Sequence, residues 1–71
     1  EGTVENSILF RGVVVQKGAT VRNSIIMQDG FVQTGAELLH CILDKQVTIQ
    51  KRTRLIGPRT YPIVLAKGLT V

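Results

Sequence analysis

The fold is decided by a short stretch near the start of the chain, VENSILF at residues 4–10. It returns as VRNSIIM at residues 21–27 and, more loosely, as LLHCILD at residues 38–44, which gives the copies a constant 17-residue spacing. Two further columns of residues keep the same spacing, one formed by Gly18 and Gly35 and the other by Val15, Val32 and Ile49. Agreement among independent columns predicts a repeat protein with a 17-residue period.

Each 17-residue unit is built from shorter units of about six residues, such as VQKGAT at residues 15–20 and VQTGAE at residues 32–37. A unit begins with an aliphatic residue, continues with polar residues or Gly, and has a small or aliphatic residue four positions after the first. This pattern predicts a triangular prism in which each unit forms one side and one corner. Gly18 and Gly35 lie where the chain must turn sharply, and Gly adopts a positive φ at little cost. Successive coils then stack as parallel strands about 4.8 Å apart.

The sequence therefore predicts an all-β parallel solenoid with about three 17-residue coils over residues 4–56. The pattern breaks at Gly57-Pro58 and again at Pro62, since Pro removes a backbone donor. We expect residues 57–71 to form an irregular C-terminal cap on a single domain spanning residues 1–71.

One apolar column is expected to face outward. If Val4, Ile8 and Phe10 point into the prism, the alternation of strand side chains places Leu9 outside. The residues that share its register position are Ile26 and Leu43. Exposed apolar patches commonly mark contact surfaces, so the sequence predicts that Leu9, Ile26 and Leu43 form an interface stripe that packs against another subunit or against another domain of the same protein.

The composition excludes several classes of protein. The chain has 71 residues, one Cys, one His and no Trp. One Cys cannot form an internal disulfide, and one Cys with one His falls short of the three or four ligands of a zinc site. The sequence contains no apolar run near the roughly 20 residues of a membrane span. We expect no cofactor, no metal and no catalytic site within these residues.

The charge is uneven along the chain. Residues 44–71 hold six of the nine Lys and Arg residues but one of the five acidic residues. These cations are candidate contacts for an anionic effector such as a sugar phosphate: Lys45, Lys51, Arg52, Arg54, Arg59 and Lys67. The alternative is that they solvate the surface and protect strand edges. Nucleic acid is not an expected partner, because single-strand binding needs aromatic stacking and the chain has three aromatic residues.

Two reactive side chains are adjacent in the third copy of the repeat. His40 occupies the column of Asn6 and Asn23, and Cys41 follows it in the next column. A general base must lie within hydrogen-bond reach of its substrate. We expect His40 to be a polar corner residue and Cys41 a small packing residue.

The six-residue rule resembles the hexapeptide-repeat family, whose fold is the left-handed parallel β-helix. The stretches NSILFRGV (residues 6–13), NSIIMQ (residues 23–28) and ILDK (residues 42–45) narrow the resemblance. They look like the C-terminal domain of bacterial ADP-glucose pyrophosphorylase, or glucose-1-phosphate adenylyltransferase. Within this family, these stretches are most similar in sequence to the glycogen-biosynthesis regulatory subunit of Gram-positive bacteria. The ending, LIG at residues 55–57 and PIV at residues 62–64, is similar to the same subunit.

The resemblance implies a cytoplasmic, non-catalytic β-helix domain that supports oligomer assembly and allosteric control. Its implied partners are other pyrophosphorylase subunits in a homo- or hetero-oligomer and its own N-terminal domain. That nucleotidyltransferase domain, absent from this sequence, would join ATP and glucose 1-phosphate into ADP-glucose and pyrophosphate with Mg²⁺. Lys67 is similar in position to an effector-binding Lys in plant relatives. The chain would then be a fragment of a larger protein.

The alternative is a fragment of a trimeric hexapeptide-repeat acyltransferase with His40 in a cleft between subunits. Such an enzyme is expected to carry a long loop that leaves the coils. The repeat runs without such a loop from Val4 to Leu55. The sequence therefore favours the assembly domain.

Overall fold

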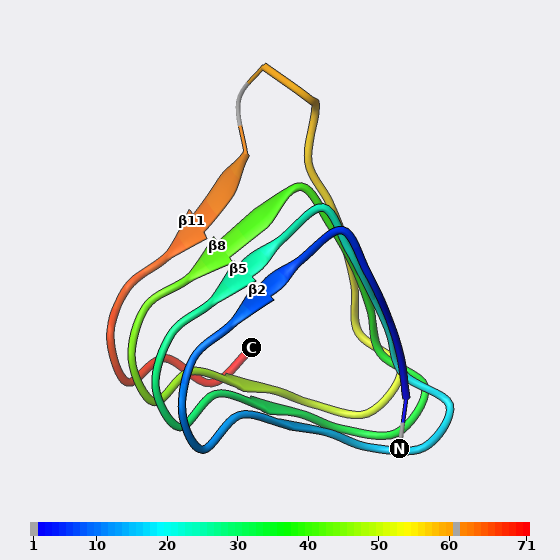
Figure 1. Cartoon of the computed structure of the whole chain (residues 1–71), viewed down its shortest axis with the longest axis vertical. Helices are drawn as coiled ribbons and strands as arrows, with labels where there is room; N and C mark the ends of the chain where they lie inside the picture. The colour runs from blue at the N-terminus through cyan, green and yellow to red at the C-terminus, as the bar shows by residue number, and fades with distance from the viewer. Residues whose placement is uncertain (1, 61) are drawn as a thin grey trace.

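The chain winds into a triangular solenoid of parallel strands, shown end-on in Figure 1. This computed structural model describes residues 2–60 and 62–71. Its first sheet, sheet 1, has the order β1 (Thr3–Glu5), β4 (Thr20–Arg22), β7 (Glu37–Leu39) and β10 (Arg54–Ile56). Sheet 2 has the order β2 (Ile8–Leu9), β5 (Ile25–Ile26), β8 (Cys41–Leu43) and β11 (Ile63–Leu65). Sheet 3 has the order β3 (Val14–Val15), β6 (Phe31–Val32) and β9 (Thr48–Ile49).

The strand register confirms the 17-residue period. Val4 pairs with Val21, Val21 with Leu38, and Leu38 with Leu55. Each step in this series is one 17-residue coil. Like residues therefore stack over like residues, as the sequence predicts for an all-β solenoid.

A residue with positive φ turns the chain at each corner of the first three coils. Gly18 (φ 84°) and Gly35 (φ 77°) do so after sheet 3, as predicted, and Arg52 (φ 60°) takes the same position in the next coil. Asn23 (φ 49°) and His40 (φ 55°) turn the chain after sheet 1. Asn tolerates this conformation better than most residues because its short side chain can hydrogen-bond locally.

The core is a narrow aliphatic column inside the prism. Its members are each at most 1% exposed: Ala19, Val21, Ile26, Val32, Ala36, Leu38, Cys41, Leu43, Val47 and Ile49. The same columns open to solvent in the first coil, where Val4 and Leu9 are each 39% exposed. The middle coils thus hold the apolar core.

The predicted interface stripe is wrong. Ile26 and Leu43 are fully buried, and Leu9 shares their inward column. The outward residues of sheet 2 are instead their neighbours Ile8, Ile25, Ile42 and Val64. Ile8 and Val64, at the two ends of this row, are 58% and 67% exposed.

The physical reason for the error is the position of the shortened side. The inward residues Val21 and Ile26 are five positions apart, whereas Ile26 and Val32 are six apart. The positive φ of Asn23 lies inside the short side and restarts the alternation, so the side chain of Ser24 points inward and is 2% exposed. An alternation counted through this corner therefore places the next strand on the wrong face.

A ladder of polar side chains closes the same corner. The Ser7 Oγ donates to the Glu5 carbonyl (2.8 Å) and accepts the Ser24 amide (3.1 Å). One coil further on, the Ser24 Oγ donates to the Arg22 carbonyl (2.8 Å) and accepts the Cys41 amide (3.2 Å). Buried backbone amides need partners, so this column supplies hydrogen bonds where the chain turns away from the sheet.

The C-terminal end is more regular than predicted. A coil of regular length would stack Pro58 on Cys41, but Cys41 pairs with Ile63, so the last coil is longer than the repeat by five positions. Residues 57–60 leave the prism as a projecting loop at the corner between sheets 1 and 2 (Figure 1). Beyond it, β11 rejoins sheet 2 and Thr70 bridges Thr48 beside sheet 3. The expected cap therefore contains an insertion followed by a resumed coil.

Candidate functional site

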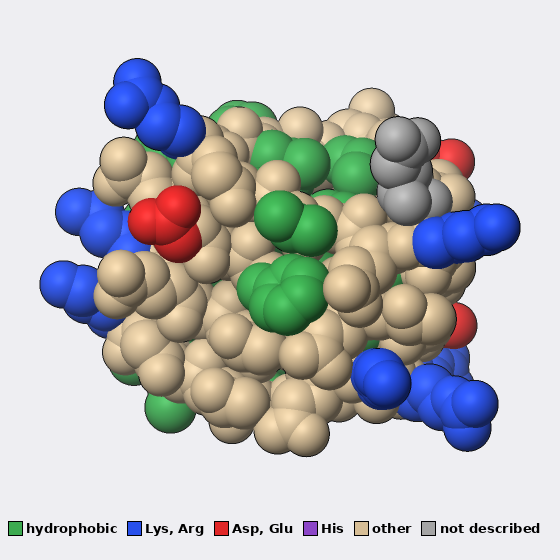
Figure 2. Space-filling model, turned by 90° about the horizontal axis from the view of Figure 1, so that it is seen from below, with side chains coloured by type: hydrophobic (Ala, Val, Ile, Leu, Met, Phe, Trp, Pro, Cys, Tyr) green, Lys and Arg blue, Asp and Glu red, His purple; other side chains and the backbone are tan. Residues whose placement is uncertain are grey.

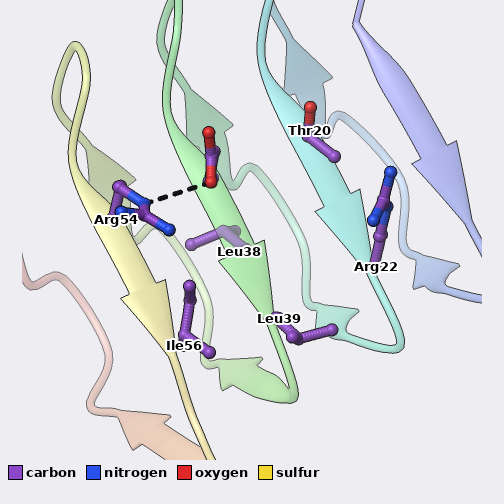
Figure 3. Close-up of a pocket in the computed structure, with 7 residues that line it drawn as sticks. Thr20, Arg22, Leu38, Leu39, Arg54 and Ile56 are labelled. Carbon is purple, nitrogen blue, oxygen red and sulfur yellow. Dashed lines mark hydrogen bonds and ion pairs between the residues drawn. The ribbon is translucent and has the colours of Figure 1, made fainter.

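A groove of about 360 Å³ lies on the outer face of sheet 1 (Figure 3). Its lining residues come from β4, β7 and β10: Thr20, Arg22, Glu37, Leu38, Leu39, Arg54 and Ile56. Thr20, Glu37 and Arg54 share one register column, while Arg22, Leu39 and Ile56 share another. The groove is thus lined by one polar column and one partly apolar column.

Both cations of this groove have carboxylate partners. Nε of Arg22 lies 3.2 Å from Oε1 of Glu5, and Nε of Arg54 lies 3.2 Å from Oε1 of Glu37. All four side chains are at least half exposed, so each pair contributes about 1 kcal/mol or less to stability. The pairing neutralises the groove, which leaves Arg54 poorly suited to hold an anionic effector.

The six candidate effector residues are not gathered in one place. Lys45 and Lys67 lie at the corner between sheets 2 and 3, while Lys51 and Arg52 lie at the corner between sheets 3 and 1. Arg54 belongs to the groove, and Arg59 lies in the projecting loop. The structure therefore divides the basic C-terminal segment among four locations.

The repeat brings other cations into line with these residues. One corner position is shared by Arg11, Gln28, Lys45 and Lys67. The residue after this position in each coil donates its amide to the carbonyl of the preceding coil: Asp29 to Arg11 (3.0 Å), Gln46 to Gln28 (2.9 Å) and Gly68 to Lys45 (3.0 Å). At the other corner, Lys17 and Lys51 share a column with Thr34 between them. We call these sets, with Arg52, the two cation columns: Arg11, Lys45 and Lys67 in one, and Lys17, Lys51 and Arg52 in the other.

Sequence reasoning missed Arg11 and Lys17 because charge was counted along the chain. The signal was available in the repeat itself. Lys17 precedes Lys51 by two 17-residue periods, and Arg11 precedes Lys45 by the same interval. Aligning the cations by their position in the 17-residue repeat pairs those of the first coil with those of the third.

His40 lies at the corner that Asn6 and Asn23 also form. Its φ of 55° matches their values of 47° and 49°, and its carbonyl accepts the Ile63 amide at 3.0 Å. The backbone conformation thus accounts for a polar residue here. The projecting loop follows this corner in the next coil.

Cys41 is fully buried in sheet 2. Its Sγ lies 3.4 Å from the Leu39 carbonyl oxygen and 3.3 Å from that of Leu55. Burial raises the pKa of the Cys41 thiol above its ordinary 9.0, and the Leu39 hydrogen bond lowers it by a smaller amount. A buried, protonated thiol is inert, so Cys41 acts as a packing residue with a weak donor.

The described residues offer few other sites. Among residues 2–60 and 62–71, no three His, Cys, Asp or Glu side chains are grouped so that they could hold a metal ion. Over the same part of the chain, there is no helix with the length and hydrophobicity needed to cross a membrane.

Comparison with known proteins gives two matches. The family model described as GlmU-like, C-terminal hexapeptide matches residues 1–59. A curated relative, the glycogen biosynthesis protein GlgD of Bacillus subtilis (strain 168), is 62% identical over 69 residues. That alignment covers 97% of this chain but 20% of the relative, so the chain spans about a fifth of the length of that protein. No solved structure matches the chain.

Proposed function

The chain belongs to the GlmU-like C-terminal hexapeptide family, and we propose that it is the non-catalytic assembly domain of a glycogen biosynthesis protein. The role in glycogen biosynthesis rests on its similarity to GlgD of Bacillus subtilis. The parent protein would be a subunit of a glucose-1-phosphate adenylyltransferase, which forms ADP-glucose from ATP and glucose 1-phosphate in the cytoplasm. A separate nucleotidyltransferase domain would carry the catalytic residues.

The observation that carries an assembly role is the outer face of sheet 2. Ile8, Ile25, Ile42 and Val64 form one apolar row across all four strands of this sheet. Phe10, just beyond β2, is also exposed, at 47%. Contiguous apolar surface of this kind marks contact with another protein surface. We name the row Ile8, Ile25, Ile42 and Val64 the sheet 2 ridge.

The occupant we propose for the sheet 2 ridge is a second subunit of the same assembly. The row itself is uncharged, which suits the centre of a stable interface, where charged residues are depleted. The hydrogen-bonded parallel strands of sheet 2 also hold this row in one arrangement, so that little ordering is needed on contact.

A second proposed role is the binding of a phosphate-bearing metabolite at Lys45 and Lys67. These residues occupy adjacent coils at one corner, and the Gly68 amide donates to the Lys45 carbonyl at 3.0 Å. Stacked coils lie about 4.8 Å apart, so two ammonium groups can approach one phosphate. Arg54 is left out of this proposal because Glu37 pairs with it.

The acyltransferase alternative has less support. It would use His40 as a general base, but the corner conformation already explains why a polar residue stands there. Replacing His40 with Asn, the residue of the preceding coils, would separate the two roles. An assembly domain keeps its function in the His40→Asn variant, whereas an acyltransferase loses its activity.

The assembly role is tested in the full-length protein by the Ile25→Lys and Ile42→Lys variants. Each places a charge in the middle of the sheet 2 ridge without touching the core. We expect a lower oligomer mass by sedimentation velocity. The matched control is Thr20→Lys on the outer face of sheet 1, beside Glu37, which should keep the native mass. Equal masses for all three variants would contradict the proposal.

A further inference from the structure

The outer face of sheet 3 has an apolar strip between the two cation columns (Figure 2). Val14, Phe31 and Thr48 share the outward register position of β3, β6 and β9, and Val14 is 49% exposed. Figure 2 looks onto this side of the molecule and shows apolar side chains in the middle with Lys and Arg along both edges. We call the strip together with the two cation columns the sheet 3 face.

Polar amides lie between the strip and one cation column. Gln16, Gln33 and Gln50 share the register position that follows the strands of sheet 3. The Gln16 Oε1 accepts the Thr34 amide at 3.1 Å, which fixes that side chain against the next coil. The sheet 3 face therefore presents an apolar centre, amide side chains and cations in parallel rows.

The charge of the chain is concentrated on this face. The two cation columns hold six of the nine Lys and Arg residues, and the adjoining corner holds two of the five acidic residues, Asp29 and Asp44. Their difference equals the formal net charge of +4 of the whole chain. Elsewhere, Arg22 and Arg54 are paired with Glu5 and Glu37.

We propose that the sheet 3 face docks a partner protein whose contact surface has carboxylates on both sides of an apolar centre. An apolar centre with a polar rim is the usual anatomy of a protein interface. Cations on both edges select an acidic partner, because complementary charge speeds encounter and like charge disfavours the wrong partner. This inference does not depend on the sheet 2 ridge or on the role proposed for it.

Two other occupants fit the observations less well. A second copy of the same face would set cation columns against cation columns, which costs binding free energy. A nucleic acid would be held by its phosphates and by stacking, but the strip supplies one aromatic side chain, Phe31. The apolar and β-branched centre favours a protein surface.

The test uses the full-length protein and a fluorescein-labelled synthetic peptide with a Leu-Val-Phe centre between two runs of Glu. Binding is followed by fluorescence anisotropy at about 50 mM and about 300 mM salt, where screening differs. We expect binding that weakens with salt and that falls about tenfold in the double variants Lys17→Glu/Lys51→Glu and Lys45→Glu/Lys67→Glu. The Val14→Ser variant should weaken binding severalfold at both salt concentrations.

The charge-matched comparison sets the single variant Lys51→Glu, which should weaken binding, against Arg59→Glu, which makes the same charge change in the projecting loop and should bind the peptide like the native protein. Three results would overturn the proposal. The first is equal binding by Lys51→Glu and Arg59→Glu. The second is equal affinity for a peptide with a Ser-only centre, which would leave charge alone as the cause. The third is tighter binding of oligo-dT through the same lysines, which would make the face a site for nucleic acid.

Discussion

The outer faces of sheets 2 and 3 come from the same coils but differ in charge. The sheet 2 ridge is an uncharged row that crosses all four strands. The sheet 3 face has an apolar strip that gives way to Thr48 and is bordered by cations. Because equivalent positions of successive coils stack on one another, a residue type that recurs in the repeat forms a whole column on one side of the prism. A solenoid can therefore present a different kind of surface on each side.

The largest effect is expected where an outward residue is compared with its inward neighbour. Ile26 is fully buried and Ile25 lies outside it in the same strand. The Ile26→Ala variant should lose about 2–5 kcal/mol of unfolding free energy, because it opens a cavity in a thin core. The Ile25→Ala variant should lose about 1 kcal/mol or less.

Urea denaturation followed by circular dichroism measures both variants. The comparison is sharp because the two substitutions remove the same atoms one position apart. A larger loss of unfolding free energy for Ile25→Ala would mean that Ile25, and not Ile26, points into the core. That result would contradict the assignment of the sheet 2 ridge to the outer face.

A smaller effect is expected at the hydroxyl ladder that precedes sheet 2. In the Ser24→Ala variant the buried Cys41 amide loses its 3.2 Å acceptor, so unfolding free energy should fall by about 1–3 kcal/mol. Ser7→Ala, in the more exposed first coil, should cost less because water can replace the lost oxygen. Hydrogen exchange at the Cys41 amide should speed up in Ser24→Ala. Unchanged exchange there would show that the ladder does not hold this corner.

The smallest effect concerns alkaline pH. Burial raises the pKa of the Cys41 thiol in the folded state above its ordinary 9.0. Above pH 9.0 the thiol of the unfolded chain ionises while the folded thiol keeps its proton, so the unfolded state is stabilised relative to the folded state. The stability that Cys41 contributes is thus present below this pH and declines above it.

The Cys41→Ser variant isolates this contribution, because Ser does not titrate in the same range. The difference in unfolding free energy between the native chain and Cys41→Ser should shift against the native chain as the pH rises from 8 through 10. A difference that stays constant would mean that the folded thiol ionises as readily as the unfolded one.

Much of the fold was predictable because the structural repeat of a solenoid is visible as a repeat in its sequence. The 17-residue spacing, the Gly18 and Gly35 corners and the parallel stacking are all confirmed. The prediction of Leu9, Ile26 and Leu43 as an outward stripe failed for a local reason. The position of the residue with positive φ decides which of the three sides is one residue shorter. At this corner the residues are Asn23 and His40, whose identity does not predict a positive φ as Gly does.

The candidate site was predictable only in part. The basic residues of the last coils were identified, but their grouping depends on three-dimensional register, which joins Lys45 to Arg11 and Lys51 to Lys17. The cap over residues 57–71 was expected to be irregular because of its prolines. The parallel pairing of β11 with β8 shows that a five-residue insertion can leave the register beyond it intact.

The central claim is that the sheet 2 ridge is covered in the assembled protein. It is tested most directly by maleimide labelling of the full-length protein, in a Cys41→Ser background, with single cysteines introduced as Ile25→Cys and Thr48→Cys. Both positions are partly exposed and outward in the chain. The account predicts slow labelling of Ile25→Cys, rapid labelling of Thr48→Cys, and equal rates once the assembly is dissociated. Equally rapid labelling of both cysteines in the intact assembly would contradict it.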